Sequence, residues 1–245
     1  MTEERKDRSL TVSPLQVDFQ GFLSITELCD LLLETASLHA TSVGFGFEDM
    51  HKENSAWVLT RLLIRIQEPA KVFDLVKIET WVDSMSTAFT TRKFNIRNGN
   101  GSVIASASST WMLIDIKSRR PKLIEEGLFQ YLLEPGKECL TGQPAKIEKP
   151  KIMGNPFLYR VKYSDIDIQN HVNSVKYLEW AIDQFPKTQF MQYRLYEVQI
   201  NYLAETLFGD ELEITSGQPA ENEYILNMDN QRKTVCRASV TWLKK

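Results

Sequence analysis

The sequence predicts a duplicated α+β fold, in which each of two units contains a strand, a helix and then several strands. The main reason is that segments of the first half recur in the same order in the second half. Residues 103–111 and 234–242 both end in Ala-Ser-x-Thr-Trp, and Ala238 follows Ala107 by 131 positions. Repetition of this kind indicates two copies of one structural unit.

Two further pairs of segments support the duplication. Residues 73–80 resemble residues 209–215, with an offset of 136 positions between their aspartates. Residues 17–19 and 161–163 each precede a helical pattern, and they are 144 positions apart. The offsets drift, as they would if loops differ in length between two copies.

The first helix is predicted by a capping signal and by its apolar spacing. Ser24 and Glu27 form a capping box, and the apolar positions that follow include Leu28 and Leu32. Gly44 is a stop signal. Because apolar residues lie on more than one face of this helix, we expect it to be buried.

The remaining elements are predicted by polar and apolar alternation and by turn residues. In the first half, strands are expected at residues 57–67, 76–83, 88–97 and 102–116, with a hairpin turn at Asn98-Gly-Asn-Gly101. In the second half, the helix is expected at residues 175–184 and the strands at residues 195–204, 211–216, 224–228 and 234–243.

The halves are separated by residues 134–151, which are rich in Pro, Gly and Lys and are predicted to be a linker. The expected domains are therefore residues 1–133 and 152–245. A buried helix followed by enough antiparallel strand to wrap it is the hot-dog arrangement. We predict an α+β tandem (double) hot-dog, with two antiparallel sheets each wrapping a long helix and paired so that strand edges are removed.

The composition excludes several functional classes. The net charge is −3, with 29 basic and 32 acidic residues, which argues against a general electrostatic contact with nucleic acid. No apolar run approaches the ~20 residues that a membrane-spanning helix needs, and residues 1–10 resemble neither a signal peptide nor a transit peptide. Cys29, Cys139 and Cys236 are far apart and lack metal-ligand spacing. We therefore expect a soluble, cytoplasmic protein without metal or cofactor.

The strongest functional signal is the stretch 164–173, Ser-Asp-Ile-Asp-Ile-Gln-Asn-His-Val-Asn, which leads into a helical pattern. If it stays extended, the side chains of Asp167, Gln169 and His171 share one face, and the two isoleucines face the other way. The N-terminus of the following helix presents N–H groups that can hold an oxyanion, as acyl transfer requires.

A structural interpretation of the same stretch is also open. Asp167 and Asn170 or Asn173 can form turn and cap interactions, with His171 simply packed against its neighbours.

The stretch 165–180 resembles the active-site signature of the plant and bacterial acyl-acyl carrier protein (acyl-ACP) thioesterases. The resemblance extends over about residues 12–243. Further segments with counterparts in family order are Val43-Gly-Phe-Gly46, Trp57-Val-Leu-Thr-Arg61, Glu79-Thr-Trp-Val82, Arg92-Lys-Phe-Asn-Ile-Arg97, Ala107-Ser-Ser-Thr-Trp111 and Arg119-Arg-Pro121.

The resemblance implies a double hot-dog enzyme that hydrolyses the thioester between a fatty acyl chain and the phosphopantetheine arm of acyl carrier protein. Asp167 and His171 match the catalytic acid and imidazole of the family, and Glu205 matches its catalytic glutamate. Gln169 stands where the family usually has Asn, so the catalytic amide is expected from either Gln169 or its neighbour Asn170.

A second departure from the family concerns the mechanism. Thr206 stands where many relatives have Cys, and a threonine hydroxyl is a much weaker nucleophile than a thiolate. We therefore expect hydrolysis by water that Glu205 and His171 activate. The alternatives are an acyl-coenzyme A thioesterase and a non-catalytic module that binds acyl chains or carrier protein. A hot-dog dehydratase is less favoured.

The first unit lacks this chemistry in the sequence alignment of the two halves. At the offset of 144, Asp167 and His171 fall opposite Leu23 and Glu27, and at the offset of 136, Glu205 falls opposite Pro69. We therefore expect a non-catalytic first unit that holds the acyl chain along its helix, where Leu32 is a candidate contact.

Acyl carrier protein is acidic, so the resemblance also implies a basic docking patch. The candidate residues lie in two basic stretches of the chain: Arg92, Lys93, Arg97, Lys117, Arg119, Arg120 and Lys122.

The resemblance also implies a homodimer, because relatives in the family dimerise.

Overall fold

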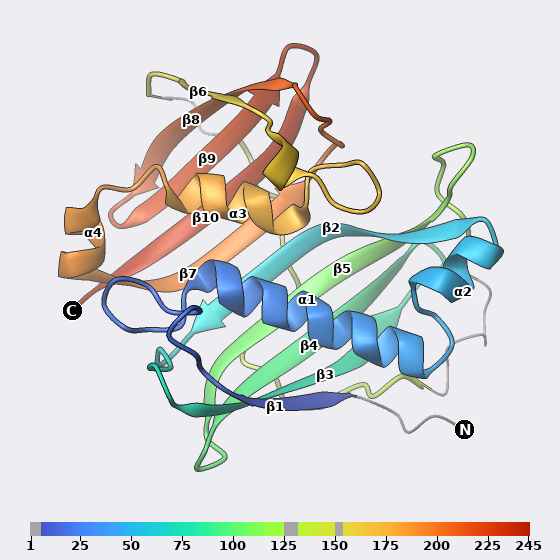
Figure 1. The fold of residues 1–245 in the computed structure, drawn as a ribbon, viewed down its shortest axis with the longest axis horizontal. Helices are drawn as coiled ribbons and strands as arrows, with labels where there is room; N and C mark the ends of the chain where they lie inside the picture. Colours follow the sequence, from blue (N-terminus) through green and yellow to red (C-terminus); the bar gives the residue numbers. More distant parts are fainter. Residues whose placement is uncertain (1–5, 125–131, 150–153) are drawn as a thin grey trace. The chain divides into compact units, whose positions relative to one another are not determined.

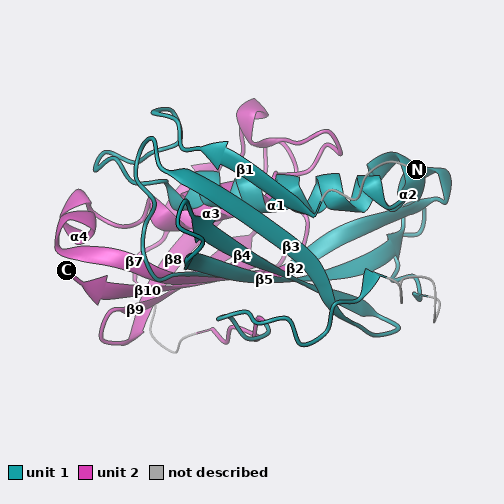
Figure 2. Cartoon of the chain, turned by 90° about the horizontal axis from the view of Figure 1, so that it is seen from below, with its two compact units in different colours: residues 1–60, 64–143 teal, residues 61–63, 144–245 magenta. Residues whose placement is uncertain are grey.

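The computed structural model of the chain describes residues 6–124, 132–149 and 154–245. These residues divide into two compact units, coloured separately in Figure 2. The first unit comprises residues 1–60 and 64–143, and the second comprises residues 61–63 and 144–245.

The first unit has one long helix lying across an antiparallel sheet (Figure 1). Its strands follow the order β1-β3-β4-β5-β2, and the neighbours from β1 to β5 are antiparallel. The elements are β1 (Asp7–Thr11), α1 (Ile25–Ser42), α2 (Phe47–Lys52), β2 (Ser55–Ile66), β3 (Leu75–Met85), β4 (Phe89–Asn98) and β5 (Val103–Asp115).

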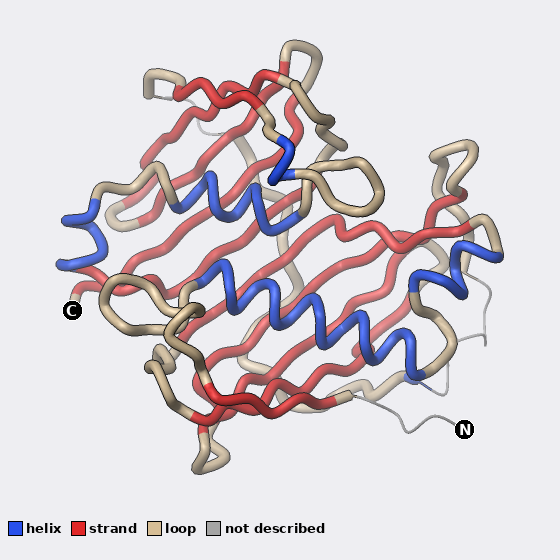
Figure 3. The backbone as a smooth tube through the Cα atoms, in the orientation of Figure 1, coloured by secondary structure: helices blue, strands red, loops and turns tan. Residues whose placement is uncertain are grey.

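The second unit repeats this topology with a shorter helix (Figure 3). Its strand order is β6-β8-β9-β10-β7, which is the order of the first unit strand for strand. The elements are β6 (Phe157–Arg160), a 3-10 turn (Tyr163–Asp165), α3 (Ser174–Ile182), α4 (Lys187–Gln192), β7 (Tyr193–Tyr202), β8 (Glu211–Ala220), β9 (Glu223–Asn230) and β10 (Thr234–Lys244). The predicted duplication is confirmed in the topology.

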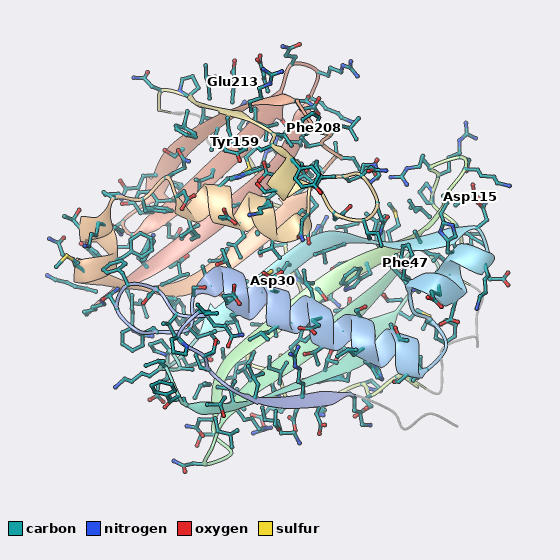
Figure 4. All side chains as sticks on the ribbon, viewed as in Figure 1. Asp30, Phe47, Asp115, Tyr159, Phe208 and Glu213 are labelled. Carbon is teal, nitrogen blue, oxygen red and sulfur yellow. The ribbon has the colours of Figure 1, made fainter. Side chains whose placement is uncertain are left out.

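The predicted limits of the first helix are confirmed. The hydroxyl of Ser24 accepts the N–H of Glu27 at 3.2 Å, which satisfies one of the free donors at the start of α1. The chain leaves the helix through Gly44, whose φ of +83° suits glycine. Leu28 and Leu32 are buried, and α1 packs against β3, whereas Asp30 lies on the exposed side of the helix (Figure 4).

Several elements differ from the prediction. The second unit does not wrap a long helix, because α3 has nine residues against the 18 of α1. The strand predicted before the helix of each unit is present as β1 and β6, for which no limits were predicted, whereas the helices α2 and α4 are missing from the sequence prediction. Each has four to six residues, too few to display a helical or strand period.

The segment predicted as a linker has no helix or strand in its described part, residues 134–149, and side chains of the strands hold it. In the first unit, Asn95 donates to the carbonyl of Glu138 at 2.9 Å. In the second unit, Arg237 donates to the carbonyl of Ile147 at 3.1 Å, and the amide of Asn201 accepts the N–H of Ile147 at 2.8 Å. These bonds satisfy backbone groups that have no strand partner.

Asn201 should therefore contribute strongly to the stability of the second unit. It is 2% exposed and also donates to the carbonyl of Ala145 at 3.0 Å. Asn201→Ala is expected to lower the free energy of unfolding by about 1–3 kcal/mol, because it leaves the buried N–H of Ile147 unpaired. Gln199→Ala is the matched control, since Gln199 makes similar bonds to Ala145 nearer to solvent. Equal losses in urea denaturation would contradict this account.

Candidate functional site

Two side chains from different parts of the second unit meet near the start of α3. The imidazole Nε2 of His171 lies 3.3 Å from the carboxylate Oε2 of Glu205. The side chains are 24% and 44% exposed, respectively, so both remain accessible to a small molecule. The expected convergence of His171 and Glu205 is therefore found in the structure.

The loop that carries His171 is a closed turn, and the prediction of an extended stretch was wrong. Ile166 and Val172 pair as an antiparallel bridge, and the N–H of Asp167 donates to the carbonyl of His171 at 2.8 Å. The chain reverses at Asn170, which has a φ of +61°. Ile168 consequently lies at the tip and is 85% exposed.

The carboxylate of Asp167 is engaged by this loop. Its Oδ1 accepts the N–H of Gln169 at 2.8 Å and the N–H of His171 at 3.3 Å. The side chains of Gln169 and Asn170 lie on the exposed side of the loop. The turn therefore separates the polar residues that an extended strand would have placed on one face.

A backbone hydrogen bond joins the two segments that carry the pair. The N–H of Val172, next to His171, donates to the carbonyl of Thr206, next to Glu205, at 3.0 Å. Asn173 then caps α3, because its side chain accepts the N–H of Val175 at 2.9 Å. Of the first-turn N–H groups that could hold an oxyanion, the one on Val175 is thus already engaged, and Ser174 carries another.

The loop before α1 in the first unit has the same hydrogen bonds as the loop before α3. The carboxylate Oδ1 of Asp18 accepts the N–H groups of Gln20 at 2.8 Å and Phe22 at 3.1 Å. The N–H of Asp18 donates to the carbonyl of Phe22 at 2.7 Å. Gly21 takes the left-handed position with a φ of +81°, and Val17 and Leu23 form the antiparallel bridge.

This match corrects the sequence alignment of the two halves at the loop. The offset there is 149 positions, so Asp167 corresponds to Asp18 and His171 to Phe22, and the earlier pairing with Leu23 and Glu27 was wrong. The likeness of Asp-Phe-Gln-Gly at residues 18–21 to Asp-Ile-Gln-Asn at residues 167–170 is the sequence signal that could have found it.

The pairing of Glu205 with Pro69 agrees with the structure. In the first unit, the N–H of Leu23 donates to the carbonyl of Ala70 at 2.8 Å. This is the counterpart of the bond from Val172 to Thr206 in the second unit. Pro69 precedes Ala70 as Glu205 precedes Thr206, so the first unit has neither the imidazole nor the carboxylate.

Arg92 does not lie on a docking surface, contrary to the prediction. Its Nη1 contacts the Nδ1 of His39 at 2.8 Å and donates to the hydroxyl of Thr80 at 3.2 Å. His39 is 1% exposed on α1. Burial of the Arg92 guanidinium lowers its pKa to about 10, which is a sign of desolvation rather than of an exposed charge.

The other basic candidates differ in their surroundings. Lys93 pairs with Asp83 at 3.1 Å, so its charge is balanced within the first unit. Arg119 and Arg120 are exposed in the loop after β5, which begins beside Asp115 (Figure 4). Hydrogen bonds from Ser118 lower the pKa of the Asp115 carboxyl and hold this loop in shape.

Other candidate residues are part of the core. Leu32 is fully buried on α1, and Thr206 is fully buried beside Glu205. Among residues 6–124, 132–149 and 154–245, no group of three or more His, Cys, Asp or Glu side chains could hold a metal ion. No helix within those ranges is long and apolar enough to cross a membrane.

Two family models match almost the whole chain. The model described as "Acyl-ACP thioesterase N-terminal domain" matches residues 4–132, and "Acyl-ACP thioesterase C-terminal domain" matches residues 149–244. The boundary between the two matches lies in the segment that was predicted as a linker.

Comparisons with individual proteins agree with the family models. A crystal structure of an acyl-ACP thioesterase from Bacteroides thetaiotaomicron is 32% identical, covers 97% of both chains and has a TM-score of 0.90. The 12:0-ACP thioesterase from Umbellularia californica, at 20% identity, covers 98% of this chain and 97% of its own, and shares the fold with a TM-score of 0.87. Oleoyl-acyl carrier protein thioesterase 2 from Arabidopsis thaliana, named as chloroplastic, is 26% identical over 87% of this chain. The chain spans 63% of the length of that plant protein.

The buried cysteines should react slowly with thiol reagents. Burial raises the pKa of Cys29 and Cys236 above the usual range, whereas Cys139 is partly exposed. In the folded protein at pH 8, iodoacetamide is expected to label Cys139 first, because a protonated buried thiol is unreactive. Mass spectrometry of the labelled peptides measures the order, with urea-unfolded protein as control. Rapid labelling of Cys29 or Cys236 in the folded protein would contradict the burial.

Proposed function

Because the chain belongs to the acyl-ACP thioesterase family, we propose that it hydrolyses the thioester of fatty acyl-ACP to free fatty acid and carrier protein. The observation that carries this proposal is the 3.3 Å contact between His171 and Glu205. It lies in the unit whose counterpart has Phe22 and Pro69 in the same places. A carboxylate and an imidazole in contact can activate a water molecule.

In the proposed reaction, Glu205, assisted by His171, takes a proton from water as the water oxygen bonds to the thioester carbonyl carbon. The carbonyl oxygen becomes an oxyanion, and the N–H of Ser174 at the start of α3 is proposed to stabilise it. The tetrahedral intermediate then collapses, and the carbon–sulfur bond breaks. The departing thiolate of the carrier arm receives the proton from the pair.

A cysteine nucleophile is not part of this proposal. Thr206 occupies the position after Glu205, and its fully buried hydroxyl has no thiolate character. The amide of Gln169 or Asn170 keeps its proposed role in placing water or substrate, which would require the exposed loop tip to be covered by the bound substrate.

The division of labour between the units is also a proposal. We propose a tandem hot-dog, with residues 152–245 as the catalytic domain and residues 1–133 as the domain that holds the acyl chain, joined by residues 134–151. The shared strand order of the two units supports the tandem arrangement. Leu32, within the apolar part of α1, is the proposed helix contact for the chain.

The sequence also leads us to propose a homodimer and a cytoplasmic location for the protein, and both stay predictions.

An acyl-coenzyme A thioesterase is the alternative activity, because the scissile bond and the arm are the same on both carriers. Comparison of turnover on the two carriers at equal acyl chain length distinguishes these activities. A profile over chains of graded length gives the preferred substrate.

Removal of either member of the pair should abolish most of the turnover. Glu205→Gln and His171→Ala are each expected to lower kcat on acyl-ACP by about 10²–10⁴, which is the usual contribution of general base catalysis. Glu213→Gln is the matched control, since Glu213 is an exposed glutamate on β8 of the same unit (Figure 4). Wild-type turnover in both variants would exclude the mechanism. Tight binding without turnover by the wild type would instead identify a non-catalytic binding module.

The exposed arginines of the loop after β5 are proposed to dock the acidic carrier protein. The double variant Arg119→Ala/Arg120→Ala is expected to raise KM for acyl-ACP and to weaken its salt dependence, because two charges leave the encounter surface. KM for acyl-coenzyme A should change less. The matched control is Arg232→Ala/Lys233→Ala, which removes the same charge from the exposed turn between β9 and β10. Equal effects of both double variants would contradict a local docking patch.

A further inference from the structure

We infer that Asp167 is a positioning residue, which fixes the backbone that presents His171, and that its negative charge is not needed by the imidazole. The inference rests on the proposed hydrolysis and concerns the role of the Asp167 carboxylate in that reaction. A catalytic acid beside an imidazole would ordinarily be expected to bond the ring and fix its tautomer. The geometry of this loop points to a different use.

The first reason is the direction of the carboxylate. Within the described part of the chain, the hydrogen bonds of the Asp167 side chain go to backbone N–H groups, those of Gln169 at 2.8 Å and His171 at 3.3 Å. An aspartate that accepts N–H groups two and four residues ahead closes a local turn. The turn determines where the Cα of His171 lies and hence where its ring can reach Glu205.

The second reason is that the first unit contains the same aspartate without the chemistry. Asp18 accepts the N–H groups of Gln20 and Phe22 with Oδ1 at 2.8 and 3.1 Å. Phe22 has no imidazole for a carboxylate to orient, and yet the aspartate and its bonds are present. The aspartate and its two hydrogen bonds are present in both loops, whereas the histidine is present in one. Orientation of a histidine therefore cannot be the reason for the aspartate.

The same comparison accounts for the other polar residues of the loop. Gln169 has Gln20 as its counterpart, so it is also present in the unit without the pair. Asn170 stands at the left-handed position that Gly21 occupies in the first unit, and asparagine is among the side chains that tolerate this conformation best. A Cβ at Gly21 would meet nothing within 4 Å, so the position selects for conformation rather than for space. The loop geometry and the first-unit counterparts thus account for Asp167, Gln169 and Asn170. They do not account for His171.

The test compares the amide and the alanine at position 167. The side-chain oxygen of asparagine can accept the same two N–H groups without a charge. Asp167→Asn is therefore expected to keep kcat on acyl-ACP within about threefold and the pH midpoint of kcat/KM within about half a unit. Asp167→Ala, which cannot close the turn, should lower kcat by about tenfold or more.

The result that would overturn the inference is a folded Asp167→Asn variant with a large loss of kcat. Where a carboxylate fixes the tautomer of an imidazole directly, its replacement by an amide costs on the order of 10⁴ in kcat. A downward shift of the acidic limb of the pH profile in Asp167→Asn would also overturn it, because it would show that the charge stabilises the protonated ring.

The first unit supplies the control for stability. Asp18→Ala removes the same two hydrogen bonds from a loop with Phe22 in place of His171, and it should lower the thermal midpoint about as much as Asp167→Ala does. Asp18→Asn and Asp167→Asn should both retain the midpoint. These measurements do not need turnover, so they test the loop even if the wild type fails to hydrolyse acyl-ACP. That failure would remove the proposed function and leave the positioning inference to the thermal data.

Discussion

The candidate site depends on one backbone hydrogen bond, from the N–H of Val172 to the carbonyl of Thr206 at 3.0 Å. The neighbouring residues His171 and Glu205 lie 34 positions apart in the sequence but are held together because this bond ties their segments. Local turns on both sides, closed by Asp167 and by Asp210, remove most of the freedom that the two segments would otherwise have. The side chains of the pair therefore need little further ordering to meet.

The duplication makes the chain its own comparison. In both units, an aspartate closes the loop before the helix, a left-handed residue reverses the chain, and a backbone bond joins the loop to the segment that follows the next strand. What differs between the units is the side chain placed on that framework: imidazole and carboxylate in the second, phenyl and pyrrolidine rings in the first. The proposed catalytic pair thus differs from its counterpart in the first unit by few side chains on one shared framework.

Charged residues that are adjacent in sequence have different surroundings in this fold. Arg92 and Lys93 are consecutive on β4, where side chains alternate between the two faces of the sheet. Arg92 points toward His39 of α1 and is desolvated, whereas Lys93 pairs with Asp83. A basic run on a strand therefore does not form one patch, whereas the basic loop after β5 keeps Arg119 and Arg120 on the exposed surface.

The sequence by itself determined the duplication, the type and approximate limits of the longer helices and strands, and the identity of the residues in the pair. The limits of the helices and strands follow from local periodicity, capping and turn chemistry, as at Ser24 and at residues 98–101. The duplication follows from the repeated segments, and the pair was identified through the resemblance to the acyl-ACP thioesterase family. Only the tertiary structure decided that residues 165–171 close into a turn, that Arg92 contacts His39 of α1 and that Asp167 bonds backbone N–H groups. The physical reason is that Arg92 contacts a residue 53 positions away, and that the turn is closed by side-chain-to-backbone hydrogen bonds within the loop. Polar and apolar alternation carries no signal for either kind of contact.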